Sequence, residues 1–211
     1  MSVTDSSTTA PTTAITTKGE QTRREILEVA IQRFGRDGFR ATSVADIARD
    51  ADVSGTLAYA YFDNKRALFL AALDADIAAL IEEGVSSVLE TPGDQTWRDS
   101  LVLTLIEALD RRPLARRMLA GLEPEVADRI IELPAMEHLR GAVAARLRAD
   151  QEAGLVRAEI DAETIGHGIV GIFITMLLAA VQFGTEGAMS HGRDMLAVVE
   201  AAVDPPASRP G

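Results

Sequence analysis

Side chains that could bind DNA are concentrated in one short stretch of the chain, from Thr42 to Lys65. Tyr59 and Tyr61 carry phenol hydroxyls, which can hydrogen-bond phosphate oxygens and fix the register of a protein on DNA without reading its sequence. Thr56 can donate or accept a hydrogen bond at a base edge, and its methyl group can contact a thymine methyl. A small residue such as Gly55 would let a helix approach closely. These residues therefore offer hydrogen bonding and van der Waals contact with nucleic acid.

Two short predicted helices would position these side chains. Ser43 is a natural N-cap for the first helix, and Asp46 three residues later makes a capping-box-like pair with it. The turn is predicted over residues 51–53, where Asp52 would take a left-handed conformation that Asp tolerates better than most residues. Ser54 caps the second helix. This layout is typical of a helix-turn-helix, which places its second helix in the major groove of DNA.

Helical spacing separates an inward from an outward side in this stretch. The residues predicted to face inward are apolar: Val44, Ile47, Ala48, Ala58 and Phe62. Lys65 begins the next helix, where a cation opposes the helix dipole, and a bound phosphate would remove that conflict. In the alternative interpretation, Tyr59 and Tyr61 are core aromatics and Lys65 is a solvated charge. Spacing alone leaves both interpretations open.

The chain before this stretch is predicted to support it. Residues 1–19 are rich in Ser and Thr and lack periodicity, which indicates a disordered arm. Residues 20–37 predict a helix whose apolar stripe consists of Ile26, Leu27, Ala30 and Phe34. Gly38 would end this helix in a left-handed conformation. Residues 20–66 are therefore expected to form one DNA-binding domain.

The charge distribution is compatible with DNA binding by that domain alone. The whole chain of 211 residues has a formal net charge of −11, which is unusual for a nucleic-acid binder. From Lys18 to Arg66, however, the chain has nine basic and eight acidic residues, whereas the part after Arg66 has twelve basic and twenty-three acidic residues. A near-neutral head on an acidic body is possible because phosphate attraction acts within a Debye length of about 10 Å.

Several classes of protein are disfavoured by what the sequence lacks. The absence of cysteine excludes disulfides, thiolate nucleophiles and cysteine zinc sites. His138, His167 and His191 have no metal-ligand spacing, and no phosphate loop or nucleophile elbow occurs. We therefore expect no enzyme activity, no metal and no cofactor. No secretory signal is visible, and the longest apolar run, 168–181, is shorter than the roughly 18 residues of a spanning helix. A cytoplasmic protein without membrane contact is expected.

The rest of the chain predicts an all-α fold, because no strand pattern is present. Residues 67–204 are expected to form a second domain and residues 205–211 a tail. The helices predicted after the head span 65–89, 97–111, 113–120, 125–154 with an interruption at Pro134, 161–181 and 189–203. A break is expected at 91–94 and a turn at 154–157. The helix from Ile165 to Phe183 is apolar nearly all round, so it should be buried on both sides.

Residues 23–70 resemble the N-terminal domain of TetR-family transcriptional regulators. The resemblance rests on Phe34, Gly38-Phe39, Thr42-Ser43-Val44, Ile47-Ala48, Val53-Ser54, Tyr59, Tyr61-Phe62, Asn64-Lys65 and Leu68. It covers about a quarter of the chain. Two positions depart from the family pattern: Asp52 replaces the usual Gly of the turn, and Leu57 stands where Thr or Ser is frequent. The second change puts in doubt any hydrogen bond to a base from that position.

The resemblance implies a set of DNA contacts. Thr42, Tyr59, Tyr61 and Lys65 match the phosphate contacts of the family, and Gly55, Thr56, Leu57 and Ala60 occupy its base-facing positions. The N-cap residues Ser43 and Ser54 complete the predicted DNA-binding set. With so few polar side chains outward, specificity should depend more on backbone fit and DNA shape than on paired hydrogen bonds to bases.

The resemblance also implies a dimer and a ligand cavity. The last two long helices would form a homodimer interface, for which the candidates are Ile165, Gly168, Ile172, Met195 and Val199. Candidate lining residues of the cavity are Trp97, Leu101, Leu105, Met118, Met136 and Phe173, because large or flexible apolar groups often line such pockets. An ordinary core residue is the alternative for each of them.

The function expected from these patterns is ligand-responsive transcriptional regulation. A dimeric repressor would bind a palindromic double-stranded DNA operator and would be released by a small apolar or amphipathic effector. The alternative is a helical small-molecule-binding or protein-interaction module of the same fold without sequence-specific DNA binding, which the acidic total charge favours.

Overall fold

The computed structural model describes residues 12–89 and 97–205, and within these ranges every regular element is helical. The elements are α1 (Thr12–Ala41), α2 (Val44–Asp50), α3 (Gly55–Tyr61), α4 (Lys65–Leu89), α5 (Trp97–Leu109), α6 (Pro113–Leu119), the 3₁₀ helix η1 (Ala127–Glu132), α7 (Pro134–Glu152), α8 (Ala162–Phe183) and α9 (Thr185–Val203). The predicted all-α fold is confirmed.

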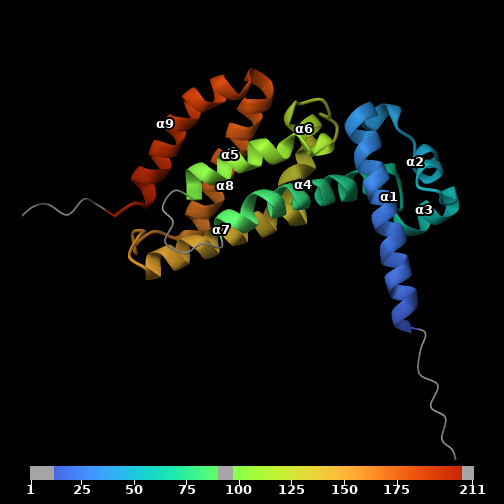
Figure 1. Cartoon of the computed structure of the whole chain (residues 1–211), viewed down its shortest axis with the longest axis horizontal. Coiled ribbons are helices and arrows are strands. Elements are labelled where there is room, and N and C mark those ends of the chain that lie inside the picture. Colours follow the sequence, from blue (N-terminus) through green and yellow to red (C-terminus); the bar gives the residue numbers. More distant parts are fainter. Residues whose placement is uncertain (1–11, 90–96, 206–211) are drawn as a thin grey trace, which may run out of the picture.

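Helices α1 to α3 form a head at one end of the molecule, and α4 leads from the head into an elongated body of the remaining helices (Figure 1). The predicted stripe of α1, which includes Ile26 and Phe34, is fully buried in the head. Phe34 and Phe69 meet edge to face with ring centroids 5.0 Å apart, and Phe39 packs on Phe69 at 5.2 Å. Since Phe69 lies in the first turns of α4, aromatic packing joins the head directly to the body.

Helix α1 differs from the prediction at its start. It begins at Thr12, so residues 12–19, expected to belong to a disordered arm, are helical. The Ser- and Thr-rich composition favoured disorder, but these residues continue a helix that is already nucleated by the buried stripe, and extending a helix costs less than starting one. Residues 1–11 lie outside the described part of the chain.

Gly38 bends the chain where α1 was predicted to end. Its backbone angles are φ 85° and ψ 170°, a combination that is essentially restricted to glycine. The positive φ agrees with the prediction, although ψ lies far from that of a left-handed helical residue. The Thr42 hydroxyl donates a hydrogen bond to the Gly38 carbonyl at 2.8 Å and closes the bend before α2.

Two carboxylates of α4 cap the N-termini of two other helices in the body. The buried Asp76 carboxylate accepts hydrogen bonds from the backbone N–H groups of Leu114 and Ala115 at 3.0 and 2.9 Å, at the start of α6. Asp74 accepts from the Ala135 N–H at 2.9 Å, at the start of α7. These bonds satisfy N–H groups that a helix cannot pair internally. Helix α4 thereby sets the positions of α6 and α7.

The predicted interruption at Pro134 in the helical segment 125–154 is present, but it separates two helices instead of breaking one. Pro134 is the first residue of α7 and is preceded by the separate 3₁₀ helix η1. A proline at this position costs nothing, because the first N–H of a helix has no internal partner. Pro113 begins α6 in the same way.

The remaining helices follow the predictions with small shifts. Helix α4 has the predicted bounds, α5 ends two residues early at Leu109, and α9 begins four residues early at Thr185. Asp161 caps α8 by accepting a hydrogen bond from the Thr164 N–H at 2.7 Å. Gly154 has φ 72° in the predicted turn. The predicted break at 91–94 and the tail after Pro205 lie outside the described residues.

Candidate nucleic-acid interface

The two short helices of the head have the predicted caps. The Ser43 hydroxyl oxygen accepts a hydrogen bond from the Asp46 N–H, and that of Ser54 accepts from the Leu57 N–H, both at 3.1 Å. Between the helices, Asp52 is the only described non-glycine residue with a positive φ, 54°. The turn therefore uses aspartate where the family pattern has glycine, and α3 is held at a defined angle to α2.

The buried and exposed sides of α3 agree with the predicted inward and outward residues. Ala58 and Phe62 are buried against the head core. Thr56, Ala60 and Tyr59 are exposed, and Tyr59 retains 54% of its accessible surface. Leu57 is 38% exposed, and a Cβ added to Gly55 would meet nothing within 4 Å. The N-terminal turn of α3 is thus a small, open surface that DNA bases could approach closely.

Three of the predicted phosphate contacts have partners within the chain. Thr42 is only 2% exposed and donates its hydroxyl to Gly38, so the structure does not present this side chain to DNA, contrary to the prediction. Tyr61 is half-buried beside Phe62, and its hydroxyl lies close to Gly19 of α1. The Lys65 ammonium lies 4.6 Å from the centre of the Phe39 ring and donates to the Arg40 carbonyl at 3.3 Å. Both Tyr61 and Lys65 still reach the surface.

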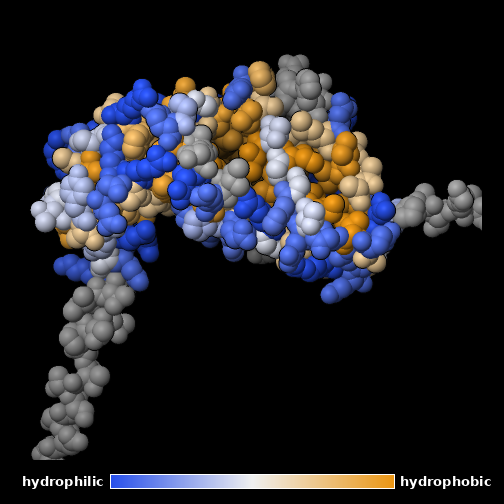
Figure 2. All heavy atoms as spheres, turned by 180° about the vertical axis from the view of Figure 1, so that it is seen from behind, coloured by the Kyte–Doolittle hydropathy of each residue, from blue (hydrophilic) through white to orange (hydrophobic). Residues whose placement is uncertain are grey.

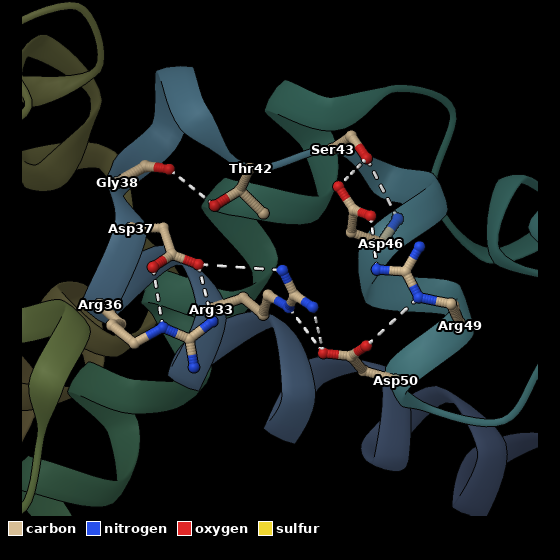
Figure 3. Close-up of polar contacts among 9 residues, drawn as sticks. All are labelled: Arg33, Arg36, Asp37, Gly38, Thr42, Ser43, Asp46, Arg49 and Asp50. Carbon is tan, nitrogen blue, oxygen red and sulfur yellow. Dashed lines mark hydrogen bonds and ion pairs between the residues drawn. The ribbon is translucent and has the colours of Figure 1, made fainter.

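A network of arginines and aspartates, not anticipated from the sequence, holds α2 against α1 (Figure 3). Arg33 contacts the Asp50 carboxylate through Nε and Nη2, each at 2.6 Å, and thereby joins the middle of α1 to the end of α2. Arg49 pairs with Asp46 at 2.6 Å and lies 3.8 Å from Asp50. Hydrogen bonds from Ser43 and then Arg49 hold the pKa of Asp46 below its ordinary value. The ionised Asp46 suits the positive end of the α2 dipole.

Arg49 is a candidate DNA contact that the sequence reasoning missed. Its side chain is 67% exposed, and it lines an open groove between α2 and α3 together with Ser54 and Gly55. Its spacing could have revealed it, because Arg49 lies in the last turn of α2, one helical turn after the outward-facing Ala45. The Arg49 guanidinium could exchange a partner carboxylate for a phosphate.

The head is clamped to the body through the loop that follows α6. The Glu123 side chain is 3% exposed, and its Oε1 accepts from Arg117 Nε at 2.5 Å and from the Phe39 N–H at 3.2 Å. A Cβ on Gly38 would lie 2.5 Å from Arg117 Nη2 and 2.6 Å from Glu123 Oε1. Nearby, Arg40 pairs with Glu125, and Arg66 donates to the Glu125 carbonyl. The loop after α6 therefore contacts the bend at the end of α1 directly.

An apolar cavity lies in the body behind this clamp. Its volume is about 80 Å³, and its walls come mainly from α4, α6, α7 and α8. Leu105, Met118 and Met136, three of the six predicted lining residues, are among its walls. The described lining consists of Ile77, Leu80, Ile81, Leu105, Ala115, Met118, Leu119, Ile130, Met136, Leu139, Ile174 and Leu177, all apolar.

The other three predicted lining residues belong to the core but not to this cavity. Leu101 and Phe173 are buried without lining it. The Trp97 ring is 1% exposed, with the Arg146 guanidinium 5.4 Å and the Arg98 guanidinium 5.9 Å from its centre. Residue type identified buried positions but could not say which side of the core each would face.

One side of α8 is left uncovered within a single chain. Gly168, Gly171, Thr175 and Leu178 are exposed at spacings of three and four residues. By length and composition α8 could cross a membrane, and 33% of its most apolar 18-residue stretch is buried. Figure 2 shows apolar side chains gathered on one face of the body, whereas the head is mostly hydrophilic. A single chain therefore covers only one side of α8, and the predicted burial of both sides would require a partner on the other.

The predicted interface residues are divided between the two sides of α8 and α9. Gly168 faces open space, and Ile165, Ile172 and Met195 are half-buried. Val199 is 3% exposed and belongs to the core of the chain, so its prediction as an interface residue is not supported. Its neighbour Val198 faces outward instead, with 64% of its surface exposed. Within the chain, a close approach between helices occurs at Gly166, where an added Cβ would lie 3.2 Å from the Ala144 nitrogen of α7.

Comparison with known proteins places this geometry among DNA-binding regulators. The sequence model of the family described as "Bacterial regulatory proteins, tetR family" matches residues 26–72, which comprise most of the head and the start of α4. The chain is 27% identical over 160 residues to the uncharacterized HTH-type transcriptional regulator YdgC of Bacillus subtilis, covering 74% of this chain and 78% of that one. It is 29% identical to the HTH-type transcriptional repressor SCO4008 of Streptomyces coelicolor, covering 68% of this chain and 71% of the repressor.

The fold of the whole chain has solved counterparts. FadR of Thermus thermophilus, a TetR-family transcriptional repressor crystallised with lauroyl-CoA, superposes with a TM-score of 0.65. The superposition covers 90% of this chain and 99% of FadR at 22% sequence identity. At this identity the likeness establishes the fold of the head and the body together.

Proposed function

This chain belongs to the TetR family of bacterial transcriptional regulators, and from that premise we propose that it represses transcription by binding a palindromic operator as a homodimer. It is a DNA-binding regulator and not an enzyme. The observation that carries the proposal is the outward side of α3, where Gly55, Thr56 and Ala60 leave the backbone open to close approach. Tyr59, Lys65 and Arg49 lie around this surface and supply phosphate contacts.

The homodimer is inferred from the uncovered side of α8. A second copy placed on Gly168, Gly171 and Leu178 would bury apolar surface that a single chain leaves open to water. Val198 of α9 would extend the same interface. A two-fold dimer presents two copies of α3, which suit two operator half-sites about 34–36 Å apart or a multiple of that distance. Because the dimer partner covers this side of α8, we infer a cytoplasmic protein without membrane contact.

The effector is proposed to enter the apolar cavity and enlarge it. The cavity of about 80 Å³ is smaller than ligand sites, which typically measure about 300–1,000 Å³. A ligand must therefore displace the walls. Met118 and Leu119 of α6 line the cavity, while Arg117 of the same helix holds Glu123 against Phe39. Displacement of α6 would thus pull on the end of α1, and movement of α4 would tilt the recognition helix that precedes it.

Coupling between the two sites then follows from thermodynamic linkage. If the effector weakens operator binding, the operator must weaken effector binding by the same factor. A coupling free energy of about 1–3 kcal/mol gives a change of roughly 5–150-fold. Measuring effector affinity with and without operator tests this mechanism, and equal affinities would refute it.

An electrophoretic shift with DNA from upstream of the gene, over a series of salt concentrations, tests the DNA-binding proposal. We expect one specific complex on a palindromic site, with affinity that falls steeply as salt rises. Thr56→Ala and Tyr59→Phe should weaken that complex. Absence of any specific shift would instead favour a small-molecule-binding or protein-interaction module of the same fold.

A further inference from the structure

Building on the proposed effector-binding function, we propose that the effector displaces one particular wall of the cavity, the 3₁₀ helix η1, and that the chain before η1 carries this movement to the head. Ile130 of η1 lines the cavity and is half-buried. Glu123 and Glu125, in the same connection between α6 and α7, contact the head. We call residues 123–130 the strap, because this short segment touches the head at one end and the cavity at the other.

The first residues of the strap are anchored to the head. The Glu123 Oε1 atom accepts a hydrogen bond from the Phe39 N–H at 3.2 Å, at the bend that ends α1. The Glu125 carbonyl accepts from Arg66 Nη1 at 3.2 Å, in the first turn of α4, and the Glu125 carboxylate pairs with Arg40 of α1. The strap therefore contacts both helices that flank the helix-turn-helix in the sequence.

The other end of the strap belongs to a weakly held wall of the cavity. No side chain caps the first turn of η1, and the hydrogen bonds of a 3₁₀ helix have poorer geometry than those of an α-helix. Helix α7, its neighbour in the chain, is the main element that η1 packs against. Arg129 and Glu132 of η1 are exposed and pair with each other at 2.8 Å. Few buried contacts and an exposed backbone are typical of a segment that opens at low free-energy cost.

The other walls of the cavity are held more firmly. The Asp76 carboxylate of α4 accepts hydrogen bonds from the N–H groups of Leu114 and Ala115 at the start of α6. A Cβ on Gly35 of α1 would lie only 2.7 Å from the Pro113 Cβ, so α1 and α4 both fix this end of α6. The remaining lining residues lie within the long helices α4, α5, α7 and α8. A ligand larger than the cavity therefore moves η1 first.

Movement of Ile130 reaches the head through few residues. Ile130 follows Glu125 by five positions, and five residues span at most about 18 Å even when fully extended. Val126 lies between them, is fully buried and serves as a pivot. Outward movement of η1 therefore pulls on Glu125 and Glu123 and changes the orientation of the head relative to the body.

Two isoleucines in the cavity wall separate this route from any other. Ile130 and Ile174 are both half-buried, but Ile174 lies within the long helix α8. Ile130→Ala and Ile174→Ala remove the same atoms from the wall. Calorimetric titration of 1-octanol, as an apolar probe, into the full-length proteins should therefore give similar affinities for the two variants.

Operator affinity, measured by fluorescence anisotropy with and without saturating 1-octanol, then tests the route. We expect octanol to weaken operator binding at least about fivefold in the wild type and in Ile174→Ala. Ile130→Ala should lose most of this effect, because octanol fills the space left by the shortened side chain without moving η1. Operator affinity without octanol should be the same in all three proteins, which also shows that the variants are folded.

Hydrogen exchange followed by mass spectrometry locates the moving wall in the wild type. Saturating 1-octanol should speed the exchange of backbone N–H groups in residues 127–132 severalfold. Those of residues 114–119 in α6 should keep their exchange rates, because Asp76 continues to hold the start of that helix. This measurement needs no substitution in the cavity wall.

An octanol effect of equal size in the two variants would overturn the inference, as would faster exchange confined to α6. Octanol that does not bind the wild type, or that binds without weakening the operator complex, would overturn it too. Failure of the proposed function is distinguishable from these results, since the wild type would then form no specific operator complex even without octanol.

Discussion

The Glu123 carboxylate accepts a hydrogen bond from the Phe39 backbone N–H at 3.2 Å, across 84 residues of sequence. This bond joins the loop after α6 to the bend that ends α1, and Arg117 on α6 holds the same carboxylate oxygen. The opposite side of α6 lines the apolar cavity. Glu123 is therefore a polar link between the helix that lines the proposed effector site and the head.

Glu123→Ala should destabilise the protein and weaken its response to effector. The substitution leaves the Phe39 N–H and the Arg117 guanidinium without their buried partner, which we expect to cost about 1–3 kcal/mol in the free energy of unfolding. Chemical denaturation measures this cost. Glu125→Ala is the control, since its partner Arg40 is 84% exposed and such pairs contribute about 0–1 kcal/mol. Equal losses in the two variants would contradict the importance assigned to the clamp.

Gly38→Ala should be more destabilising than an ordinary glycine substitution. The residue has φ 85°, and an added Cβ would meet Arg117 and Glu123. A cost of about 1–3 kcal/mol is expected from the backbone conformation alone. Gly141→Ala in the middle of α7 is the matched control, because its Cβ would meet nothing within 4 Å. The Gly141→Ala variant should be more stable than the wild type by about 0.5–1 kcal/mol. Thermal unfolding of both variants would show whether one is destabilised and the other stabilised.

Asp76 should make the protein less stable as pH rises. Burial raises the pKa of its carboxyl above the ordinary value, although bonds from Ala115 and Leu114 oppose this effect. The folded state then binds the proton more tightly than the unfolded state, so this contribution to stability is complete below the unfolded pKa and is lost as pH rises through the folded pKa. Asp76→Asn should therefore gain stability relative to the wild type as pH rises from about 4. A stability difference that is independent of pH in denaturation curves would refute this assignment.

Lys65→Gln should weaken operator binding and make it less sensitive to salt. The ammonium of Lys65 reaches the surface beside α3, and loss of one phosphate contact should lower the slope of log affinity against log salt by about one. Arg148→Gln, which removes a cation from the body where it pairs with Glu163, should leave the slope unchanged. Fluorescence anisotropy over a series of salt concentrations measures the slope for both variants. Unchanged slopes in the two variants would exclude Lys65 as a phosphate contact.

Gly171→Glu should separate the proposed dimer without unfolding the chain. A Cβ at Gly171 meets nothing within 4 Å in a single chain, so the substitution affects only a partner packed on this side of α8. Analytical ultracentrifugation should show a monomer with much weaker operator binding. Gly141→Glu places the same charge on α7 and should remain dimeric. A Gly171→Glu protein that sediments as the wild type does would place the interface elsewhere.

Local features of the head were predictable because their partners are near in the sequence. Ser43 and Ser54 cap helices through N–H groups three residues away, and the short turn requires the positive φ of Asp52. Spacing within one helix was enough to separate Ala58 and Phe62 from the outward residues of α3. Such signals depend only on the geometry of the α-helix, which is the same for any sequence that forms one.

The tertiary structure decided the features that depend on distant segments. Thr42 has a hydroxyl that could face DNA, but the bend at Gly38 turns it inward to a carbonyl. Met118 lines the cavity whereas the equally apolar Phe173 does not, and Val199 is core whereas Val198 is exposed. The contact between Glu123 and Phe39 follows from the packing of α6 on α1. Sequence alone thus determined most of the helices, their caps and the outward side of α3, while the packing of helices against one another decided which polar groups stay available for binding.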